Sequence, residues 1–217
     1  MKMIVLRLLV GAPNETHRRI QGHGLLHECT VTLKRNETCK VIDTSGASNK
    51  CKIIRRNDKT RTACEQNSRL GSSLAVNKYY IQNGNNSNNA TIPMAMVCAP
   101  GWKNTYYETV ENNSKNYMVG KCIKLTGNIK AMKCKVDGSF GCWPFWARPG
   151  NGTKGTVSSS SGRPVYSYAE AGFSLAFTKD GYELVGGPGV DDWRGAFSSP
   201  GKEWVIRTLN ISDTTYF

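Results

Sequence analysis

Cysteine is the residue type in this sequence with the widest range of possible chemistry, because it can bind metals or form disulfide bonds. No Cys-x-x-Cys spacing occurs, and the histidine nearest to a cysteine is His27, two residues before Cys29, so a zinc site has little support. An even number of cysteines in sequence-close pairs favours disulfide bonds, which form in oxidising compartments. The eight candidates for such bonds are Cys29, Cys39, Cys51, Cys64, Cys98, Cys122, Cys134 and Cys142.

Asparagine supplies a second kind of modification site. Asn-x-Ser/Thr sequons are acceptors for N-linked glycans, and a single one is common by chance in an Asn-rich chain. Seven sequons together with paired cysteines indicate a glycoprotein of the secretory pathway. The acceptor residues are Asn14, Asn36, Asn85, Asn89, Asn112, Asn151 and Asn210.

No pattern of a catalytic centre stands out. The sequence has no Gly-rich phosphate loop ending in Lys-Ser/Thr and no Gly-x-Ser-x-Gly nucleophile elbow. His17, His23 and His27 fall together near a polar turn, where we expect surface imidazoles rather than metal ligands. We therefore expect a protein that is not an enzyme.

Carboxylates are also too sparse for a calcium loop, which needs about six to eight oxygen ligands. Asp137 and Asp180 are single carboxylates before glycine, as in turns, and Asp191 with Asp192 has no third carboxylate at ligand spacing. We expect no metal and no cofactor in these residues.

Charge and hydropathy define the class of protein. A net charge of +13 on 217 residues is strongly basic, and the densest cluster, Lys52 to Arg61, has five basic residues and one acid. No nucleic-acid-binding module accompanies this cluster. It is either a solvated loop or a surface for an acidic polysaccharide or acidic protein. No apolar run is long enough for a transmembrane helix.

The first ten residues superficially resemble a signal peptide. Arg7 interrupts their apolar run, and no small-x-small cleavage site follows cleanly. We therefore expect no signal peptide and a chain that begins inside a domain.

An internal repeat organises the elements that must position these residues. Three segments end in Gly/Ala-Pro, and their prolines, Pro13, Pro100 and Pro188, lie 87 and 88 residues apart. A Gly-x-Ser segment precedes the second and third, and a glycine with alternating apolar residues follows each. Each unit therefore predicts strand, turn, strand, loop and strand. Repeated antiparallel units favour a β-propeller, with a β-sandwich as the alternative.

The third unit is the clearest. Phe173 to Thr178 alternates at the period of two that strands require. Lys179-Asp180-Gly181 supplies a hairpin turn, since Gly accepts positive φ. Tyr182 to Val185 returns as the partner strand, which Gly-Gly-Pro-Gly ends because Pro cannot donate to a ladder.

These segments resemble the FG-GAP repeats of integrin alpha subunits. Residues 172–195 resemble the third repeat, residues 70–76 with Met96-Val-Cys-Ala-Pro100 the second, and Leu8 to Asn14 the end of the first. The resemblance covers nearly the whole chain in order. It departs where Arg69-Leu70 replaces an aromatic pair and where residues 169–171 lack a cysteine, which indicates a divergent member.

This resemblance implies an all-β fold, a partial propeller of about two and a half blades out of seven. Residues 1–50 would be the end of blade 1, residues 51–150 blade 2, and residues 151–217 an incomplete blade 3. The segment between residues 125 and 172 is too short for an inserted ligand-binding domain. Calcium is expected only in later blades.

The resemblance also implies a function. The chain would belong to the extracellular ligand-binding head of a cell-adhesion receptor, a single-pass membrane protein at the cell surface. Its partners would be an integrin beta subunit and a protein ligand of the matrix or a cell surface. The alternative is a secreted FG-GAP propeller, either lectin-like or associated with an enzyme.

Four residues are the candidates for ligand or partner binding. Trp102 and Trp193 each follow a Gly/Ala-Pro turn, and loops held by a rigid scaffold often carry function. Packing against a neighbouring blade is the alternative for each tryptophan. The resemblance places Asp191, Asp192 and Trp193 on the face that meets ligand and beta subunit.

Position and resemblance together give the expected disulfides. The eight cysteines allow roughly 100 connectivities, so sequence alone does not fix them. We expect near-neighbour bonds, with Cys98–Cys122 also implied by the resemblance. The expected pairs are Cys29–Cys39, Cys51–Cys64, Cys98–Cys122 and Cys134–Cys142.

Overall fold

The structure is a computed structural model. Cys134 lies outside the residues that it describes, as do Asn36, Asn85, Asn89, Asn112, Asn151 and Asn210. The described residues are 6–17, 19–31, 38–42, 44, 51–56, 59–64, 66–78, 94–107, 114–129, 142–143, 168–193, 195–199 and 205–207.

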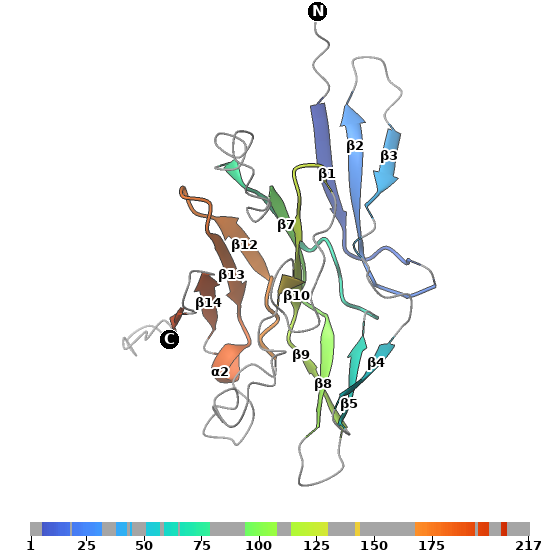
Figure 1. Cartoon of the computed structure of the whole chain (residues 1–217), viewed down its shortest axis with the longest axis vertical. Helices are drawn as coiled ribbons and strands as arrows, with labels where there is room; N and C mark the ends of the chain where they lie inside the picture. Colours follow the sequence, from blue (N-terminus) through green and yellow to red (C-terminus); the bar gives the residue numbers. More distant parts are fainter. Residues whose placement is uncertain are drawn as a thin grey trace, which may run out of the picture.

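The described chain is all-β, as expected, and forms four small antiparallel sheets (Figure 1). Three of them, here called the first, second and third repeat sheets, follow one another along the chain. The first has the order β1 (Leu6–Ala12), β2 (Leu25–Val31) and β3 (Thr38–Val41). The second has the order β11 (Cys142–Trp143), β10 (Lys121–Leu125), β7 (Ala95–Ala99) and β6 (Ser73–Val76). The third has the order β12 (Ser174–Phe177), β13 (Glu183–Gly187), β14 (Ala196–Ser199) and β15 (Val205–Arg207).

The fourth sheet, here called the accessory sheet, joins two hairpins that are distant in sequence. α2 (Val190–Trp193) is a helix of a single turn. The accessory sheet has the order β4 (Cys51–Arg56), β5 (Lys59–Cys64), β8 (Lys103–Tyr107) and β9 (Ser114–Met118).

The prolines of the repeat end strands as predicted. β1 ends immediately before Pro13, β7 before Pro100 and β13 before Pro188. Proline has no N–H for a ladder, so the chain turns away at the same point of each unit. The predicted hairpin of the third unit is also confirmed, with Gly181 at a φ of 81° between β12 and β13.

Neighbouring repeat sheets meet through the same backbone contact. A parallel bridge joins Gly24 to Leu70, between the first and second units, and another joins Gly120 to Ala171, between the second and third. Both glycines have a φ of 78°, and a Cβ on either would lie 2.2 Å from the partner's carbonyl oxygen. Only glycine permits so close an approach at this φ. The repeat in the sequence is therefore a repeat in the packing.

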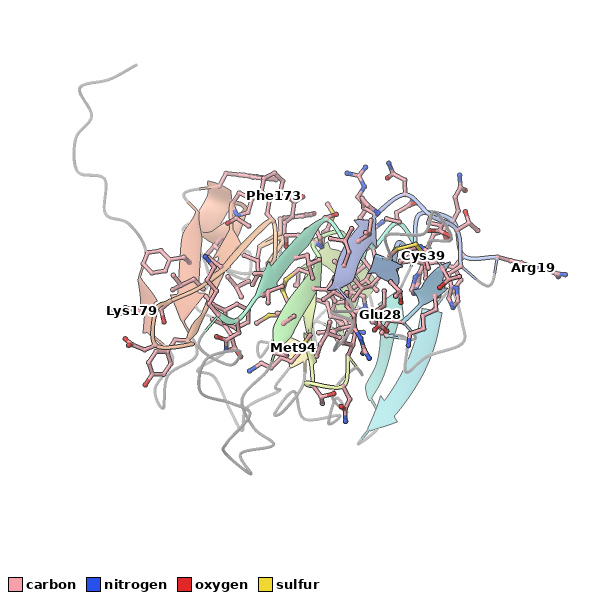
Figure 2. All side chains as sticks on the ribbon, turned by 90° about the horizontal axis from the view of Figure 1, so that it is seen from above. Arg19, Glu28, Cys39, Met94, Phe173 and Lys179 are labelled. Carbon is pink, nitrogen blue, oxygen red and sulfur yellow. A yellow bond between two sulfur atoms is a disulfide. The ribbon has the colours of Figure 1, made fainter. Side chains whose placement is uncertain are left out.

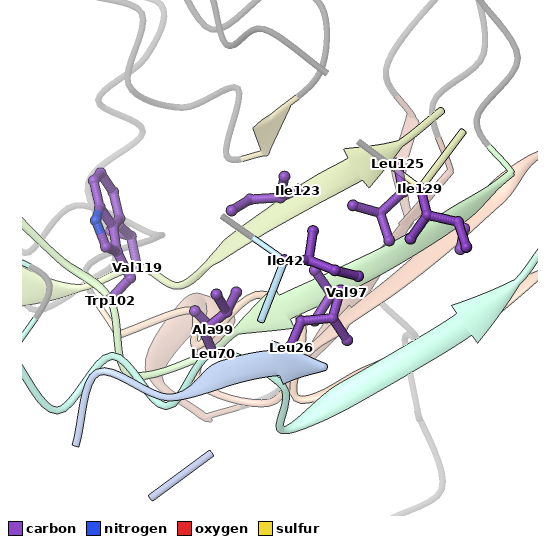
Figure 3. Packing of buried hydrophobic residues seen from close by; sticks show 11 residues of the cluster. Leu26, Ile42, Leu70, Val97, Ala99, Trp102, Val119, Ile123, Leu125 and Ile129 are labelled. Carbon is purple, nitrogen blue, oxygen red and sulfur yellow. The ribbon is translucent and has the colours of Figure 1, made fainter. Parts of the chain in front are cut away.

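The second repeat sheet lies between the first and the third (Figure 2). A hydrophobic cluster lies on each side of it, and Figure 3 shows the one shared with the first sheet. All five residues of β7 are buried. Val97 belongs to the cluster shared with the first sheet, together with Leu26 and Ile42, whereas Met96 belongs to the cluster shared with the third sheet, together with Val185. Alternate residues of one strand thus pack in opposite directions. Each such side chain contributes about 1.5–3 kcal/mol by burial.

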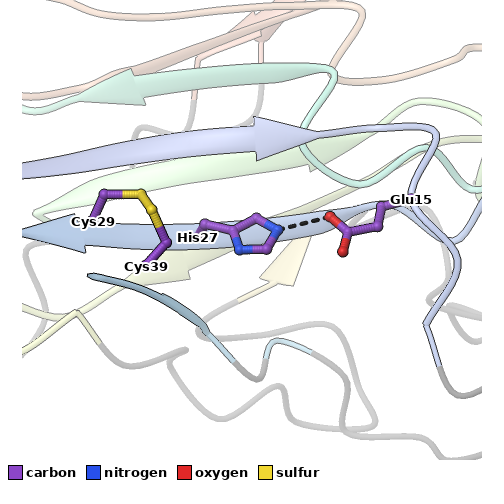
Figure 4. Close-up of a disulfide and its surroundings, with 4 residues drawn as sticks. All are labelled: Glu15, His27, Cys29 and Cys39. Carbon is purple, nitrogen blue, oxygen red and sulfur yellow. Dashed lines mark hydrogen bonds and ion pairs between the residues drawn. A yellow bond between two sulfur atoms is a disulfide. The ribbon is translucent and has the colours of Figure 1, made fainter. Parts of the chain in front are cut away.

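Two of the expected disulfides are confirmed. Cys29–Cys39 joins β2 to β3 (Figure 4), and Cys98–Cys122 joins β7 to β10. Each bond links residues directly opposite in the register. The third expected pair, residues 51 and 64, is also opposite in the β4–β5 register.

Candidate partner-binding loop

The turn from β13 to β14 is held tightly at its base. Val190, the first residue of α2, is buried, and its carbonyl accepts a hydrogen bond from the Gly195 N–H at 3.1 Å. A Cβ on Gly189 would lie only 1.7 Å from the Tyr168 carbonyl oxygen, so the backbone approaches that residue as closely as glycine allows. The anchored base fixes where the rest of the turn projects.

Trp193, the last residue of this turn, is exposed. Its side chain is 64% accessible, and its φ is 68°, in the left-handed region. Bulky residues rarely adopt this conformation, which costs about 1–3 kcal/mol. An exposed aromatic ring held in a strained conformation is a hallmark of sites where function overrides local stability.

Asp191 and Asp192 lie on the same helical turn, between Val190 and Trp193. Their backbones bring two carboxylate-bearing residues next to the exposed tryptophan. Their side chains lie outside the described part of the structure. The structure therefore places Asp191, Asp192 and Trp193 on one turn, and their role in binding stays a prediction.

Trp102 occupies a different environment. Its side chain is 7% exposed within the cluster between the first and second sheets, and Lys121 Nζ lies 5.6 Å from its ring centroid. Trp102 therefore packs between two repeat sheets, which was the alternative to partner binding, because a buried ring offers no surface to a partner. The two tryptophans follow equivalent strands, yet the structure does not present them as one exposed pair.

A buried ion pair couples the second and third repeat sheets. Lys124 Nζ on β10 lies 2.5 Å from Glu183 Oε1 on β13, with side chains 19% and 6% exposed. Burial raises the pKa of Glu183 above its ordinary value of 4.5, and the charge and hydrogen bond of Lys124 partly oppose that rise. The sequence held no signal for this pair, since its members lie 59 positions apart.

A second buried carboxylate sits in the first repeat sheet. Glu28 on β2 is 5% exposed and contacts Arg7 Nη1 at 3.1 Å and Lys40 Nζ at 2.8 Å, one from each flanking strand. Figure 2 labels Glu28 among the side chains of this sheet. Because two cations compensate the buried charge of Glu28, we interpret this cluster as part of the packing of the sheet.

The histidines differ from the expected surface imidazoles in one respect. His23 is buried, not exposed, and its Nδ1 donates to the Gly24 carbonyl at 2.6 Å. The backbone carbonyl of His23 accepts a hydrogen bond from Ser68 Oγ, and this bond links the first unit to the second. His27 is part-exposed and pairs with Glu15 at 2.7 Å (Figure 4).

Within the described residues, no group of three or more His, Cys, Asp or Glu side chains is placed to hold a metal ion. Among the same residues, no helix is long and apolar enough to cross a membrane. No protein-family model matches the chain, and no curated protein matches it either.

Proposed function

We propose that this chain is part of the extracellular head of an integrin-like alpha subunit, a non-enzymatic adhesion receptor that pairs with a beta subunit. In this proposal the three repeat sheets are consecutive blades of a propeller. The observation that carries the proposal is the repeated inter-unit contact, Gly24 with Leu70 and Gly120 with Ala171. A β-sandwich has no reason to repeat one glycine-carbonyl contact at successive interfaces, whereas equivalent blades packed side by side would repeat whatever contact joins them.

Gly195 supports the same arrangement. It begins the segment after α2, as Gly24 and Gly120 begin theirs, and its φ of 76° is close to their 78°. Among the described residues, the nearest atom to a Cβ on Gly195 would be 3.7 Å away, whereas a Cβ on either of the other two glycines would meet a carbonyl oxygen at 2.2 Å. Gly195 thus has the backbone conformation of the two contact glycines, and no described residue supplies the carbonyl.

The turn carrying Trp193 is the proposed contact with the beta subunit or the ligand. Its buried base at Val190 supplies rigidity, and its exposed ring supplies an anchor of the kind that dominates interface energies. Asp191 and Asp192 precede Trp193 in the same turn and give it negative charge, which favours a basic group on the partner. Trp102 is not part of the proposed contact, because its ring is buried between the first and second sheets.

The test is capture by a beta subunit. The chain is co-expressed in secretory cells with a panel of integrin beta ectodomains, and the complex is recovered through the beta chain. We expect capture by at least one of them and a loss of several-fold or more with Trp193→Ala, because interface tryptophans commonly contribute 2 kcal/mol or more.

Tyr182→Ala is the matched control. Tyr182 is 54% exposed and precedes β13, whereas Trp193 follows it, so the two rings lie at opposite ends of the same strand. The control should be captured as well as the unmodified chain. Failure of every beta subunit to capture the chain would refute the receptor proposal. Equal capture of both variants, secreted at equal levels, would refute the Trp193 site alone.

A further inference from the structure

The hairpin of β4 and β5 separates its basic residues by register. Residues directly opposite across two antiparallel strands share a face of the sheet, and faces alternate along each strand. The pairs Lys52–Ala63, Ile54–Arg61 and Arg56–Lys59 therefore share one face. The pairs Cys51–Cys64, Ile53–Thr62 and Arg55–Thr60 share the other. The first face, here called the basic face, thus holds four basic residues, and the second holds one.

We propose that the basic face binds a linear, sulfated polysaccharide. Strand residues advance by about 3.3 Å, so Lys52 and Arg56 are about 13 Å apart along β4, and Arg61 lies opposite the midpoint between them. The positive positions thus form a row rather than a compact pocket. A row of charges matches a polymer that carries its sulfates in sequence better than a single small anion.

The position of the hairpin suits such a ligand. β4 is the edge strand of the accessory sheet, whose order is β4-β5-β8-β9. In Figure 1 the accessory sheet occupies the lower half of the molecule, the half that also contains α2, whereas β1–β3 extend upward. The disulfides and sequons favour the secretory pathway, which gives access to extracellular polysaccharides.

Other polyanions fit the basic face less well. Single-stranded nucleic acid is held by aromatic stacking as well as charge. The six hairpin positions of this face hold no aromatic residue, and the tyrosines that share the face, Tyr106 and Tyr117, lie on β8 and β9, away from the row of charges. An acidic protein surface needs a buried apolar or aromatic anchor at its centre, and the face offers only Ile54. Protection of open strand edges against aggregation accounts for charges on β4 and at Lys59 and Arg61, which have no partner on β8, but not for their concentration on one face of the hairpin.

The binding strength should depend steeply on salt. Each cation that neutralises a fixed anionic group releases a counterion, and for nucleic acids the logarithm of affinity falls by about 0.9 per contact for each decade of salt. If the same relation holds for four contacts, affinity falls roughly 100-fold between about 50 and 200 mM salt.

The experiment measures binding of the full chain to immobilised heparin and to chemically desulfated heparin over a salt series. Arg56→Gln and Arg55→Gln are the matched pair, because they remove the same charge from adjacent residues on opposite faces. We expect Arg56→Gln to weaken binding several-fold and reduce the salt slope by about one. Arg55→Gln should leave both nearly unchanged, and Arg56→Gln with Arg61→Gln should reduce the slope by about two.

Several outcomes would overturn the proposal. They are no binding to heparin, equal effects of Arg55→Gln and Arg56→Gln, equal binding to desulfated heparin, and equal or tighter binding to poly-glutamate or DNA of the same charge. Protease resistance without reductant serves as the folding control for each variant. This proposal is independent of the receptor function, since capture by a beta subunit can succeed or fail without changing the heparin result.

Discussion

Replacing Lys124 by methionine should uncouple the second and third repeat sheets. The variant keeps the length of the side chain but leaves the carboxylate of Glu183, 6% exposed, without its cation. Removing one partner of a buried pair costs about 3–5 kcal/mol, because the remaining charge stays desolvated. We therefore expect Lys124→Met to lower the free energy of unfolding by about 3 kcal/mol at neutral pH. Pulse proteolysis in a urea series at high dilution measures this quantity without interference from association.

The loss should shrink in acid. Because burial raises the pKa of Glu183, the folded chain binds more protons than the unfolded chain between 4.5 and the raised value. The contribution of this group to stability is therefore complete below 4.5 and falls as the pH rises through the raised pKa. Without Lys124 the pKa of Glu183 rises further. Between the raised pKa of the unmodified chain and the still higher pKa of the variant, only the variant loses stability as the pH rises, so in that window the cost of Lys124→Met should shrink by about 1.4 kcal/mol for each pH unit of acidification.

Two further variants test the reasoning. Lys179→Met removes an exposed lysine of the turn before β13 and should change stability by less than about 0.5 kcal/mol. Glu183→Gln combined with Lys124→Met should recover much of the loss, since no uncompensated charge remains. A cost for Lys124→Met that is the same at pH 5 and pH 8, or no larger than that of Lys179→Met, would refute the coupling.

The remaining predictions concern glycines and cysteines. Gly172→Ala should destabilise the chain by more than about 2 kcal/mol, seen as reduced secretion, because its φ is 91° and a Cβ would lie 2.3 Å from Cys98 Cβ. Gly195→Ala should cost only about 1 kcal/mol, since its φ of 76° is unfavourable but no atom of the described residues would lie nearer than 3.7 Å to the new Cβ; equal costs would contradict the steric argument. Peptide mapping without reduction should find Cys51 bonded to Cys64, and any other partner for Cys51 would contradict the β4–β5 register.

Local patterns allowed much of the fold to be predicted. The hairpin around Gly181 and the strands that end before Pro100 and Pro188 depend on residues a few positions apart, and the structure agrees with them. The Cys98–Cys122 bond was expected because its cysteines flank adjacent strands of one unit. In each case short-range geometry determines the outcome.

Features that depend on contacts between residues far apart in the sequence could not be predicted from the sequence alone. The accessory sheet pairs Ala63 with Asn104, across 41 positions, and no periodicity predicts which hairpins meet. Burial of Trp102 and exposure of Trp193 likewise follow from what packs over each ring, although both follow equivalent turns. The left-handed conformation of Trp193 opposes its intrinsic preference, so only tertiary contacts account for it.

Because β7 is buried on both sides, the three repeat sheets form a short linear array in which each sheet is stabilised by packing against the next. The second repeat sheet contacts both others, through Val97 on one side and Met96 on the other, while each outer sheet has one such contact. In arrays of this kind, stability is a sum of the intrinsic terms of each repeat and the terms for each junction. An outer sheet can detach by breaking one junction, but the middle sheet must break both. Unfolding should therefore begin at the two outer sheets and reach β7 last.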